Sequence, residues 1–343
     1  MPAQVEGNPM VTMKDIARHA GVSPITVSRV VNGSGYVGKE TRARVEAAIR
    51  ELNYIPNLVA SSLRSRQSDL LALVLPDITN SFWTSIARGA EDEAWDHGYG
   101  VFICNTDNNV EKETAYIDKL LSRRVLGLLL VPTPDVRSES HVSRLRTHEL
   151  KLVVLHRQLQ QESADVVRID GESAAQALTS ELIKAGRRRI AFVGLPFTDS
   201  TSLDRLSGYR AAYLRAGLPY DPDLVREGDV EGGVGGYRMV SDILTAGVGA
   251  DAILLANSRL AIGGLRAIED AGLDFPHDFG VAAFHDIGAM DHYAPRLIRA
   301  VQPGYRMGQL ATRRILSMQA GSTEPFREVI LHSDIHLPTM VRQ

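Results

Sequence analysis

From Asp69 onward, short apolar runs alternate with amphipathic stretches, and this alternation constrains the fold more than any other feature of the sequence. The runs that are typical of strands cover residues 70–75, 101–104, 127–131, 152–155, 166–169, 190–193, 252–255 and 281–284. Helices fit between them over residues 83–96, 111–121, 173–184, 204–216, 260–271 and 307–318. Alternation of helices with continuously apolar strands predicts parallel sheets covered on both faces. The number of strand–helix units is too large for one compact sheet, and we therefore expect two doubly wound α/β lobes.

The composition limits the class of protein. A chain of 343 residues, 44% of them hydrophobic and 23% charged, can form two or three ordinary globular domains. No apolar run approaches the ~20 residues of a membrane span, and the N-terminus lacks a secretory signal pattern. The single cysteine, Cys104, excludes an internal disulfide and a multi-cysteine zinc site. We therefore expect a cytoplasmic protein without a membrane, metal or cofactor requirement.

Residues 12–32 are typical of two short helices around a glycine turn. Thr12 and Asp15 can form a capping box, Gly21 supplies the turn, and Ser23 can cap a helix that begins at Pro24. The side chains that can meet in a small core are Ile16, Ala17, Ala20, Val22, Val27 and Val30. Those left outward on the second helix are Pro24, Ile25, Ser28 and Arg29. This arrangement favours a DNA-binding helix-turn-helix over a generic helical hairpin.

Two further observations complete the N-terminal part. Residues 1–68 carry 9 Lys and Arg against 5 Asp and Glu, whereas the whole chain carries 38 against 41, so the head is basic and the body acidic. A third helix is expected over residues 39–52. Pro56 then interrupts regular structure, and Asn57 can cap a short helix over residues 58–64.

With its parts in this order, the sequence resembles the lactose/galactose-repressor (LacI/GalR) family from Val11 to about Leu337. The segments that carry the resemblance are residues 11–32, 47–68, 75–89, 185–191, 205–209 and 295–297. The resemblance implies a homodimeric repressor of double-stranded operator DNA, whose core is similar to periplasmic sugar-binding proteins and closes on a small effector. Residues 1–10 carry Pro, Gly and Asn without periodicity and are expected to form a disordered tail. The resemblance implies a helix-turn-helix domain over 11–56, a hinge helix over 57–68 and a core over 69–343. It places three crossings between the lobes, near Ile169, Val301 and Phe326.

The resemblance also implies how the head contacts DNA. Pro24, Ile25 and Arg29 would face base edges, where an arginine can contact guanine with two hydrogen bonds. Thr26, Ser28 and Asn32 would hold phosphates. The remaining DNA-binding positions are Thr12, Ser23, Asn57, Ala60 and Leu63. Leu63 matches a leucine that wedges into the minor groove, although it could instead pack on its own lobe.

The effector is expected between the lobes, against Asn80, Phe82, Trp83, His156, Arg157, Arg205, Asn257, His285, Asp286 and Gln302. One of the two aromatic residues could belong to the core instead. Many relatives carry Asp where this chain has His156 and His285, and Ser258 replaces an Asp that usually follows Asn257. With Arg157, Arg205 and Arg168 expected nearby, these histidines suggest an acidic effector, such as a sugar acid or sugar phosphate. Neutral histidines bound to an ordinary sugar are the alternative.

Two other functions compete with this interpretation. A periplasmic-type sugar-binding protein without DNA binding would share the core but lack the basic head. An α/β enzyme is less well supported, because the glycine cluster at residues 232–236 has Arg238 where a dinucleotide fingerprint requires its third glycine. Neither a phosphate-binding loop nor a zinc-protease signature occurs. The sequence therefore predicts a ligand-responsive DNA-binding regulator and no catalytic residues.

Overall fold

A computed structural model of the chain describes residues 11–31, 33–54, 68–159, 164–228, 232–284, 294–322, 324–325 and 327–338. The chain divides into two compact units, residues 1–67 and 68–343. The predicted site residues that lie outside the described residues are Asn32, Asn57, Ala60, Leu63, His285 and Asp286. Their roles remain predictions.

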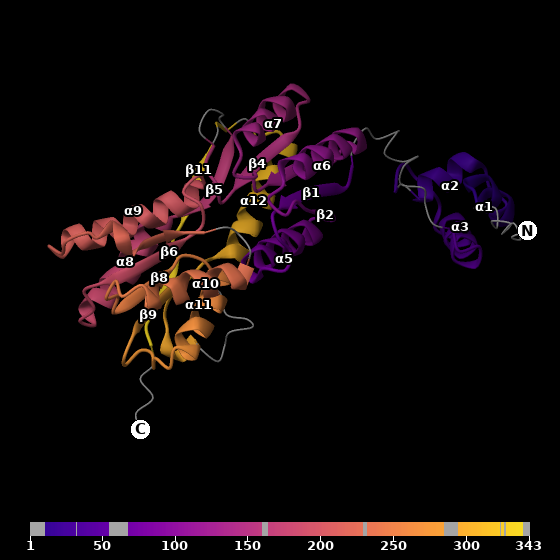
Figure 1. Ribbon diagram of the computed structural model, residues 1–343. Coiled ribbons are helices and arrows are strands. Elements are labelled where there is room, and N and C mark those ends of the chain that lie inside the picture. Colours follow the sequence, from indigo (N-terminus) through magenta and orange to yellow (C-terminus); the bar gives the residue numbers. More distant parts are fainter. Residues whose placement is uncertain are drawn as a thin grey trace, which may run out of the picture. The chain divides into compact units, whose positions relative to one another are not determined.

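The described residues of the N-terminal unit form three helices, α1 (Met13–Ala20), α2 (Pro24–Val31) and α3 (Lys39–Glu51), as Figure 1 shows. The predicted capping box is present, because the backbone N–H of Thr12 donates to Asp15 at 3.0 Å and that of Asp15 donates to the Thr12 hydroxyl at 3.4 Å. Gly21 ends α1 with a φ of 64°, in the left-handed region that glycine favours. The core contains Ile16, Ala17, Ala20, Val27, Val30, Val45, Ala48 and Tyr54. These local predictions are confirmed.

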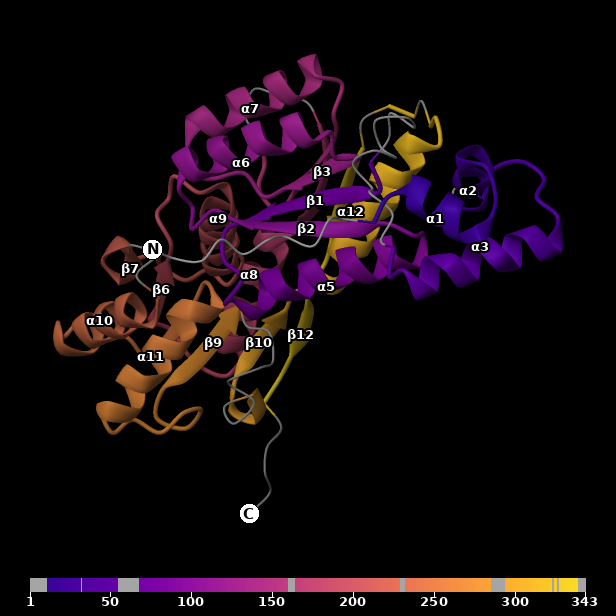
Figure 2. The same cartoon turned by 90° about the vertical axis from the view of Figure 1, so that its right-hand side faces the viewer.

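The first lobe of the C-terminal unit is a six-stranded parallel sheet in the order β11-β5-β4-β3-β1-β2. Its strands are β1 (Leu70–Leu75), β2 (Gly100–Asn105), β3 (Gly127–Leu130), β4 (Lys151–Leu155), β5 (Asp165–Ile169) and β11 (Glu328–Leu331). Two helices, α5 (Ser81–Asp96) and α12 (Gly304–Gln319), pack on one face of this sheet. The other face is covered by α6 (Val110–Arg123) and α7 (Val136–Thr147), as Figure 2 shows.

The second lobe has a six-stranded sheet in the order β12-β10-β9-β8-β6-β7, in which only the β10–β12 pair is antiparallel. Its strands are β6 (Ile190–Gly194), β7 (Val225–Glu227), β8 (Ala252–Leu255), β9 (Gly280–Phe284), β10 (Ile298–Val301) and β12 (Asp334–His336). The helices on one face are α8 (Gly171–Lys184) and α9 (Ser200–Arg215). Those on the other are α10 (Gly232–Thr245) and α11 (Ser258–Asp270), and two short 3₁₀ turns, η1 (Pro222–Leu224) and η2 (Ala294–Arg296), complete the lobe. The predicted two-lobed α/β architecture is confirmed.

The chain crosses between the lobes three times, because each sheet contains strands from distant parts of the sequence. The first crossing follows Ile169 at the end of β5, and the second follows Val301 at the end of β10, as predicted. The third was predicted near Phe326 but lies between Leu331 and Asp334, since β11 belongs to the first sheet and β12 to the second. Within the described ranges, no helix is long and apolar enough to cross a membrane.

Several helix pairs approach so closely that only glycine fits at their contacts, among them α8 with α9 and α5 with α12. A Cβ placed on Gly208 of α9 would lie 2.0 Å from the carbonyl oxygen of Glu172 in α8. A Cβ on Gly308 of α12 would lie 2.1 Å from the carbonyl oxygen of Ile86 in α5. Each lobe therefore has at least one helix pair in backbone contact, which fixes helices whose N-terminal ends border the cleft between the lobes.

Candidate effector cleft and recognition helix

A cavity of about 210 Å³ lies between the two lobes, beyond the carboxyl ends of their parallel strands. Every predicted effector residue that the structure describes lines it, namely Asn80, Phe82, Trp83, His156, Arg157, Arg205, Asn257 and Gln302. The segments that carry these residues follow β1, β4, β8 and β10 or lie in α5 and α9. The two lobes therefore build the cavity jointly, although effector binding by these residues is still a prediction.

The lining also contains charged residues that the sequence analysis did not select, Asp77, Asp107, Asp199 and Arg259. Asp199 precedes α9 and caps it, because its Oδ1 accepts hydrogen bonds from the backbone N–H and the hydroxyl of Thr201, at 2.9 and 2.7 Å. A cap signal of this kind is visible in the sequence, but it indicates a helix start and not a place in a cleft.

His156 follows β4 with a φ of 67°, a backbone conformation that histidine adopts more readily than most side chains. Its imidazole is buried with its centroid 4.9 Å from that of Phe82 and 5.2 Å from that of Trp83. Burial, followed by the positive charge of Arg205, holds the pKa of His156 well below its ordinary value. The side chain is therefore neutral at pH 7 and adds no positive charge to the cavity.

Arg157 is also buried, and each nitrogen atom of its guanidinium has an oxygen partner. Nε donates to Asp199 Oδ2 at 3.0 Å, and Nη2 lies 3.0 Å from the same oxygen. Nη1 donates to the carbonyl oxygen of Pro132 at 2.7 Å and to Asn108 Oδ1 at 3.1 Å. Arg157 thus makes a buried ion pair with the opposite lobe.

Three other predicted effector residues have defined local contacts. The guanidinium of Arg205 donates to the carbonyl oxygen of Ala256 and lies 4.2 Å from the ring centroid of Phe284. Asn80 caps α5, and Asn257 caps α11, each through its side-chain oxygen, which accepts a backbone N–H at 3.0 and 2.8 Å. The NH₂ group of each amide takes no part in these caps and is a suitable donor for sugar hydroxyls.

The charged side chains that line the cavity balance one another. Its acidic residues are Asp77, Asp107 and Asp199, and its basic residues are Arg157, Arg205 and Arg259. Arg168, invoked for an acidic effector, does not belong to the lining and forms an ion pair with Glu328 at 2.5 Å. The described part of the cavity therefore lacks the excess positive charge that the acidic-effector hypothesis assumes.

In the N-terminal unit, α2 presents the side chains that the sequence predicted to face outward. Ile25 is 66% exposed, and Pro24 and Arg29 are also exposed, whereas Val27 and Val30 are buried. Thr26 and Ser28 are half-buried beside them, and the backbone N–H of Thr26 donates to the Ser23 hydroxyl at 3.2 Å. A large apolar side chain exposed beside an arginine suits a recognition helix. The predicted base and phosphate contacts await a test.

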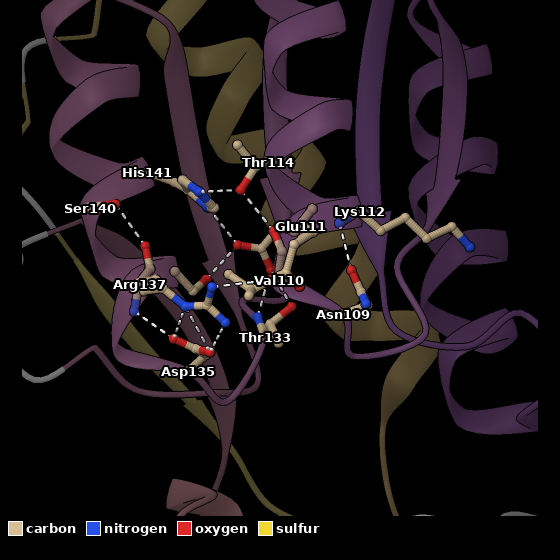
Figure 3. Close-up of polar contacts among 12 residues, drawn as sticks. Asn109, Val110, Glu111, Lys112, Thr114, Thr133, Asp135, Arg137, Ser140 and His141 are labelled. Atoms are coloured by element: carbon tan, nitrogen blue, oxygen red, sulfur yellow. Dashed lines mark hydrogen bonds and ion pairs between the residues drawn. The ribbon is translucent and has the colours of Figure 1, made fainter.

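A separate polar cluster lies between α6 and α7, outside the cavity lining (Figure 3). The fully buried carboxylate of Glu113 accepts hydrogen bonds from Ser138 at 2.5 Å, from His141 at 2.7 Å, and from the backbone and hydroxyl of Thr133, both at 2.6 Å. Burial alone would raise the pKa of Glu113, but these hydrogen bonds outweigh it and the pKa lies below its usual range. The cluster fixes the loop that follows β3.

No group of His, Cys, Asp or Glu residues suited to a metal ion occurs in the part of the chain that the structure describes.

A compact helical head with an exposed recognition helix, joined in sequence to a two-lobed unit with a polar cleft, defines a ligand-sensing DNA-binding regulator. The family described as "Bacterial regulatory proteins, lacI family" matches residues 12–57. "Periplasmic binding proteins and sugar binding domain of LacI family" matches residues 68–300. The chain therefore belongs to the LacI family of transcriptional regulators.

Individual relatives agree with this assignment over most of the chain. The catabolite control protein A of Staphylococcus xylosus is 35% identical and the ribose operon repressor of Escherichia coli 33% identical, each over 88% of this chain and 91% of the relative. The structure of a Lac repressor dimer bound to operator and an anti-inducer superimposes with a TM-score of 0.83 at 28% identity, over 95% of this chain and 97% of that one. These relatives are regulators and not enzymes, and the matched head excludes a sugar-binding protein without DNA binding.

Proposed function

We propose that the protein is a cytoplasmic homodimeric repressor that binds a two-fold symmetric operator and responds to a small neutral sugar. The observation that carries the effector class is the charge-balanced cleft, in which His156 is neutral and Arg157 is occupied by Asp199. Residues 11–56 would bind DNA, residues 57–68 would form the hinge, and residues 69–343 would bind the effector and dimerise. Sugar binding would change the closure of the lobes, and the change in operator affinity would be reciprocal.

The lining supports a neutral sugar for two reasons. Phe82 and Trp83 offer apolar ring surface, while Asn80 and Asn257 supply amide donors, a combination that suits one hydroxylated ring. The cavity of about 210 Å³ is small compared with the ~300–1,000 Å³ of pockets for drug-sized ligands. Among the relatives, one is named a ribose operon repressor and one structure is described as a cellobiose complex. A monosaccharide is therefore the first candidate.

An exposed apolar surface at the edge of the first sheet supports the homodimer. On the edge strand β2, Phe102 is 51% and Ile103 44% exposed, and Trp95 of the adjacent helix α5 is 75% exposed. Large apolar side chains that cluster on one edge mark an interaction surface. The Lac repressor structure similar to this chain is itself described as a dimer.

Calorimetric titration of the full chain tests the effector class. We expect at least one of D-ribose, D-glucose and cellobiose to bind and D-gluconate to bind at least tenfold more weakly, since the cleft has balanced charge. A matched titration with Asn257→Ala, which removes an amide of the lining, should lose affinity for the sugar that binds. Preferential binding of D-gluconate would contradict the neutral-sugar proposal and restore the acidic effector.

Arg29→Ala is expected to weaken binding to a selected operator by about 1–3 kcal/mol, or roughly 5- to 150-fold, because a bidentate arginine–guanine contact contributes that much discrimination. Fluorescence anisotropy with labelled operator measures the loss. The matched control is Arg50→Ala, which removes another exposed arginine of the same unit, on α3. Equal losses for the two variants, on matched and mismatched operators alike, would show that Arg29 contributes charge and not base recognition.

A further inference from the structure

Two ion pairs cross the cleft between the lobes, and their polarities are opposite. Arg157 of the first lobe pairs with Asp199 of the second at 3.0 Å. Asp77 of the first lobe pairs with Arg259 of the second at 2.5 Å. Each lobe thus contributes one cation and one anion, so that a sideways shift of one lobe would bring like charges toward each other.

The Arg157–Asp199 pair leaves little capacity for a ligand on either partner. Arg157 uses all three nitrogen atoms of its guanidinium, on Asp199, Pro132 and Asn108. Asp199 uses both oxygens, Oδ1 for Thr201 and Oδ2 for Arg157. A carboxylate with its acceptor positions filled cannot also accept several sugar hydroxyls. Both residues line the cavity, yet their hydrogen bonds are directed to protein groups.

Both ends of this pair are held by rigid structure. On the first lobe, the Pro132 carbonyl that accepts from Arg157 adjoins Thr133, which the buried Glu113 cluster fixes through two hydrogen bonds of 2.6 Å. On the second lobe, Asp199 caps α9. Gln158 adds a bond across the same gap, because its backbone N–H donates to the Ser200 hydroxyl at 3.3 Å. The pair therefore connects two fixed points of opposite lobes.

The two crossing pairs differ in burial. The side chains of Arg157 and Asp199 are 8% and 5% exposed, whereas that of Arg259 is 34% exposed. Water and salt screen an exposed pair, while a buried pair keeps its attraction and imposes a penalty when one partner is removed. Loss of one partner of the Arg157–Asp199 pair should consequently have a larger effect than loss of one partner of the Arg259–Asp77 pair.

We propose that the Arg157–Asp199 pair is a clamp that holds the two lobes in register and shapes the cleft for its effector. Arg157 is on this view a positioning residue, which acts on effector binding through Asp199 and not by touching the effector. The effect on affinity rests on the proposed sugar-binding function, whereas the effect on lobe closure does not. The family resemblance, in contrast, predicts that Arg157 contacts the effector directly.

A double-mutant cycle in the full-length protein tests the clamp. The variants are Arg157→Gln, Asp199→Asn and the double variant, examined by small-angle X-ray scattering without sugar and by calorimetry with D-ribose, D-glucose and cellobiose. We expect each single variant to increase the radius of gyration and to lower affinity on the order of 10- to 100-fold for the sugar that binds wild type. The double variant should lose no more than the worse single variant, because no charge is left unpaired.

The matched control is Arg314→Gln, which breaks the Arg314–Asp165 pair inside the first lobe, whose side chains are 12% and 3% exposed. It should lower stability without changing the radius of gyration or the affinity. Arg157→Lys gives a second measurement if Arg157→Gln fails to fold. It keeps the charge but lacks the planar fork, and we expect partial opening.

Scattering profiles of the Arg157 and Asp199 variants identical to wild type would overturn the clamp. So would additive losses of affinity, or a loss confined to Arg157 variants, since these would indicate a direct ligand. Absence of sugar binding by wild type would contradict the proposed function instead, and scattering would still decide on the clamp.

Discussion

Glu113→Gln is expected to destabilise the first lobe by about 3–5 kcal/mol, the loss typical of breaking a buried ionic hydrogen-bond cluster. The carboxylate accepts four hydrogen bonds, and an amide in its place would direct an N–H toward donors such as Ser138 or Thr133. Chemical unfolding followed by circular dichroism measures the change in the free energy of unfolding.

The matched control is Glu111→Gln, a change to an exposed glutamate of the same helix that pairs with Arg137 at 2.8 Å. Exposed ion pairs contribute about 0–1 kcal/mol, so this variant should remain close to wild type. Equal effects of the two variants would show that the buried cluster has no special role in stability.

The same cluster predicts a pH dependence. The pKa of Glu113 is lower in the folded protein than in the unfolded chain. The ionised carboxylate therefore contributes fully to the free energy of unfolding above the unfolded pKa of about 4.3, and this contribution is lost as the pH falls through the folded pKa. The stability difference between wild type and Glu113→Gln should therefore be largest above about pH 5 and should narrow below pH 4. A difference that is independent of pH would indicate a steric cause.

Gly208→Ala is expected to destabilise the second lobe by about 3 kcal/mol, at the upper end of overpacking effects, although Ala normally favours a helix over Gly by up to ~1 kcal/mol. The new Cβ would lie 2.0 Å from the Glu172 carbonyl oxygen and 2.9 Å from the Gln176 backbone nitrogen. Backbone atoms cannot rotate away, so α8 and α9 must separate. Thermal unfolding measures the effect.

Gly171→Ala, at the first residue of α8, is the control from the same helix pair. Its Cβ would meet side-chain atoms no closer than 3.5 Å, an ordinary contact. We expect a neutral or slightly stabilised protein. A Gly208→Ala variant as stable as Gly171→Ala would mean that the helices of this lobe can move apart at little cost.

Features that depend on neighbouring residues could be predicted from the sequence. The Thr12–Asp15 box and the turn at Gly21 need only a few adjacent residues. The central strands β1, β3 and β8 are recognised because they are continuously apolar and buried on both faces. In each case the local preference and the tertiary environment agree.

Three edge strands and two helices escaped prediction because that agreement is absent there. β11 alternates exposed and half-buried residues, and β7 and β12 have three residues each, so none forms an apolar run. α7 is mostly polar, with buried His141 and Ser138 on its inner face, and α10 begins in the glycine cluster at residues 232–236. The third crossing was misplaced for the same reason, since its position follows from β11 and β12.

The residues of the cleft also differ in how well they could be predicted from the sequence. The resemblance selected residues that do line the cavity, such as Trp83 and Arg205. It did not select Asp199 or Arg259, whose partners lie on the other lobe and far away in the sequence. The sequence also does not indicate that the guanidinium of Arg157 forms an ion pair with Asp199. This pairing depends on how the two separate sheets face each other.

The contact of Trp83 with His156 has a practical consequence for spectroscopy. The chain has two tryptophans, and both lie on α5, Trp83 in its first turn at the cavity and Trp95 in its last turn at the exposed edge. The indole of Trp83 should change its emission when a sugar enters, while that of Trp95 should respond when subunits separate on dilution. In a Trp95→Phe variant, the emission of Trp83 would be the only tryptophan signal. The protein thus carries two intrinsic fluorescent reporters on a single helix, one for sugar binding and one for assembly of the subunits.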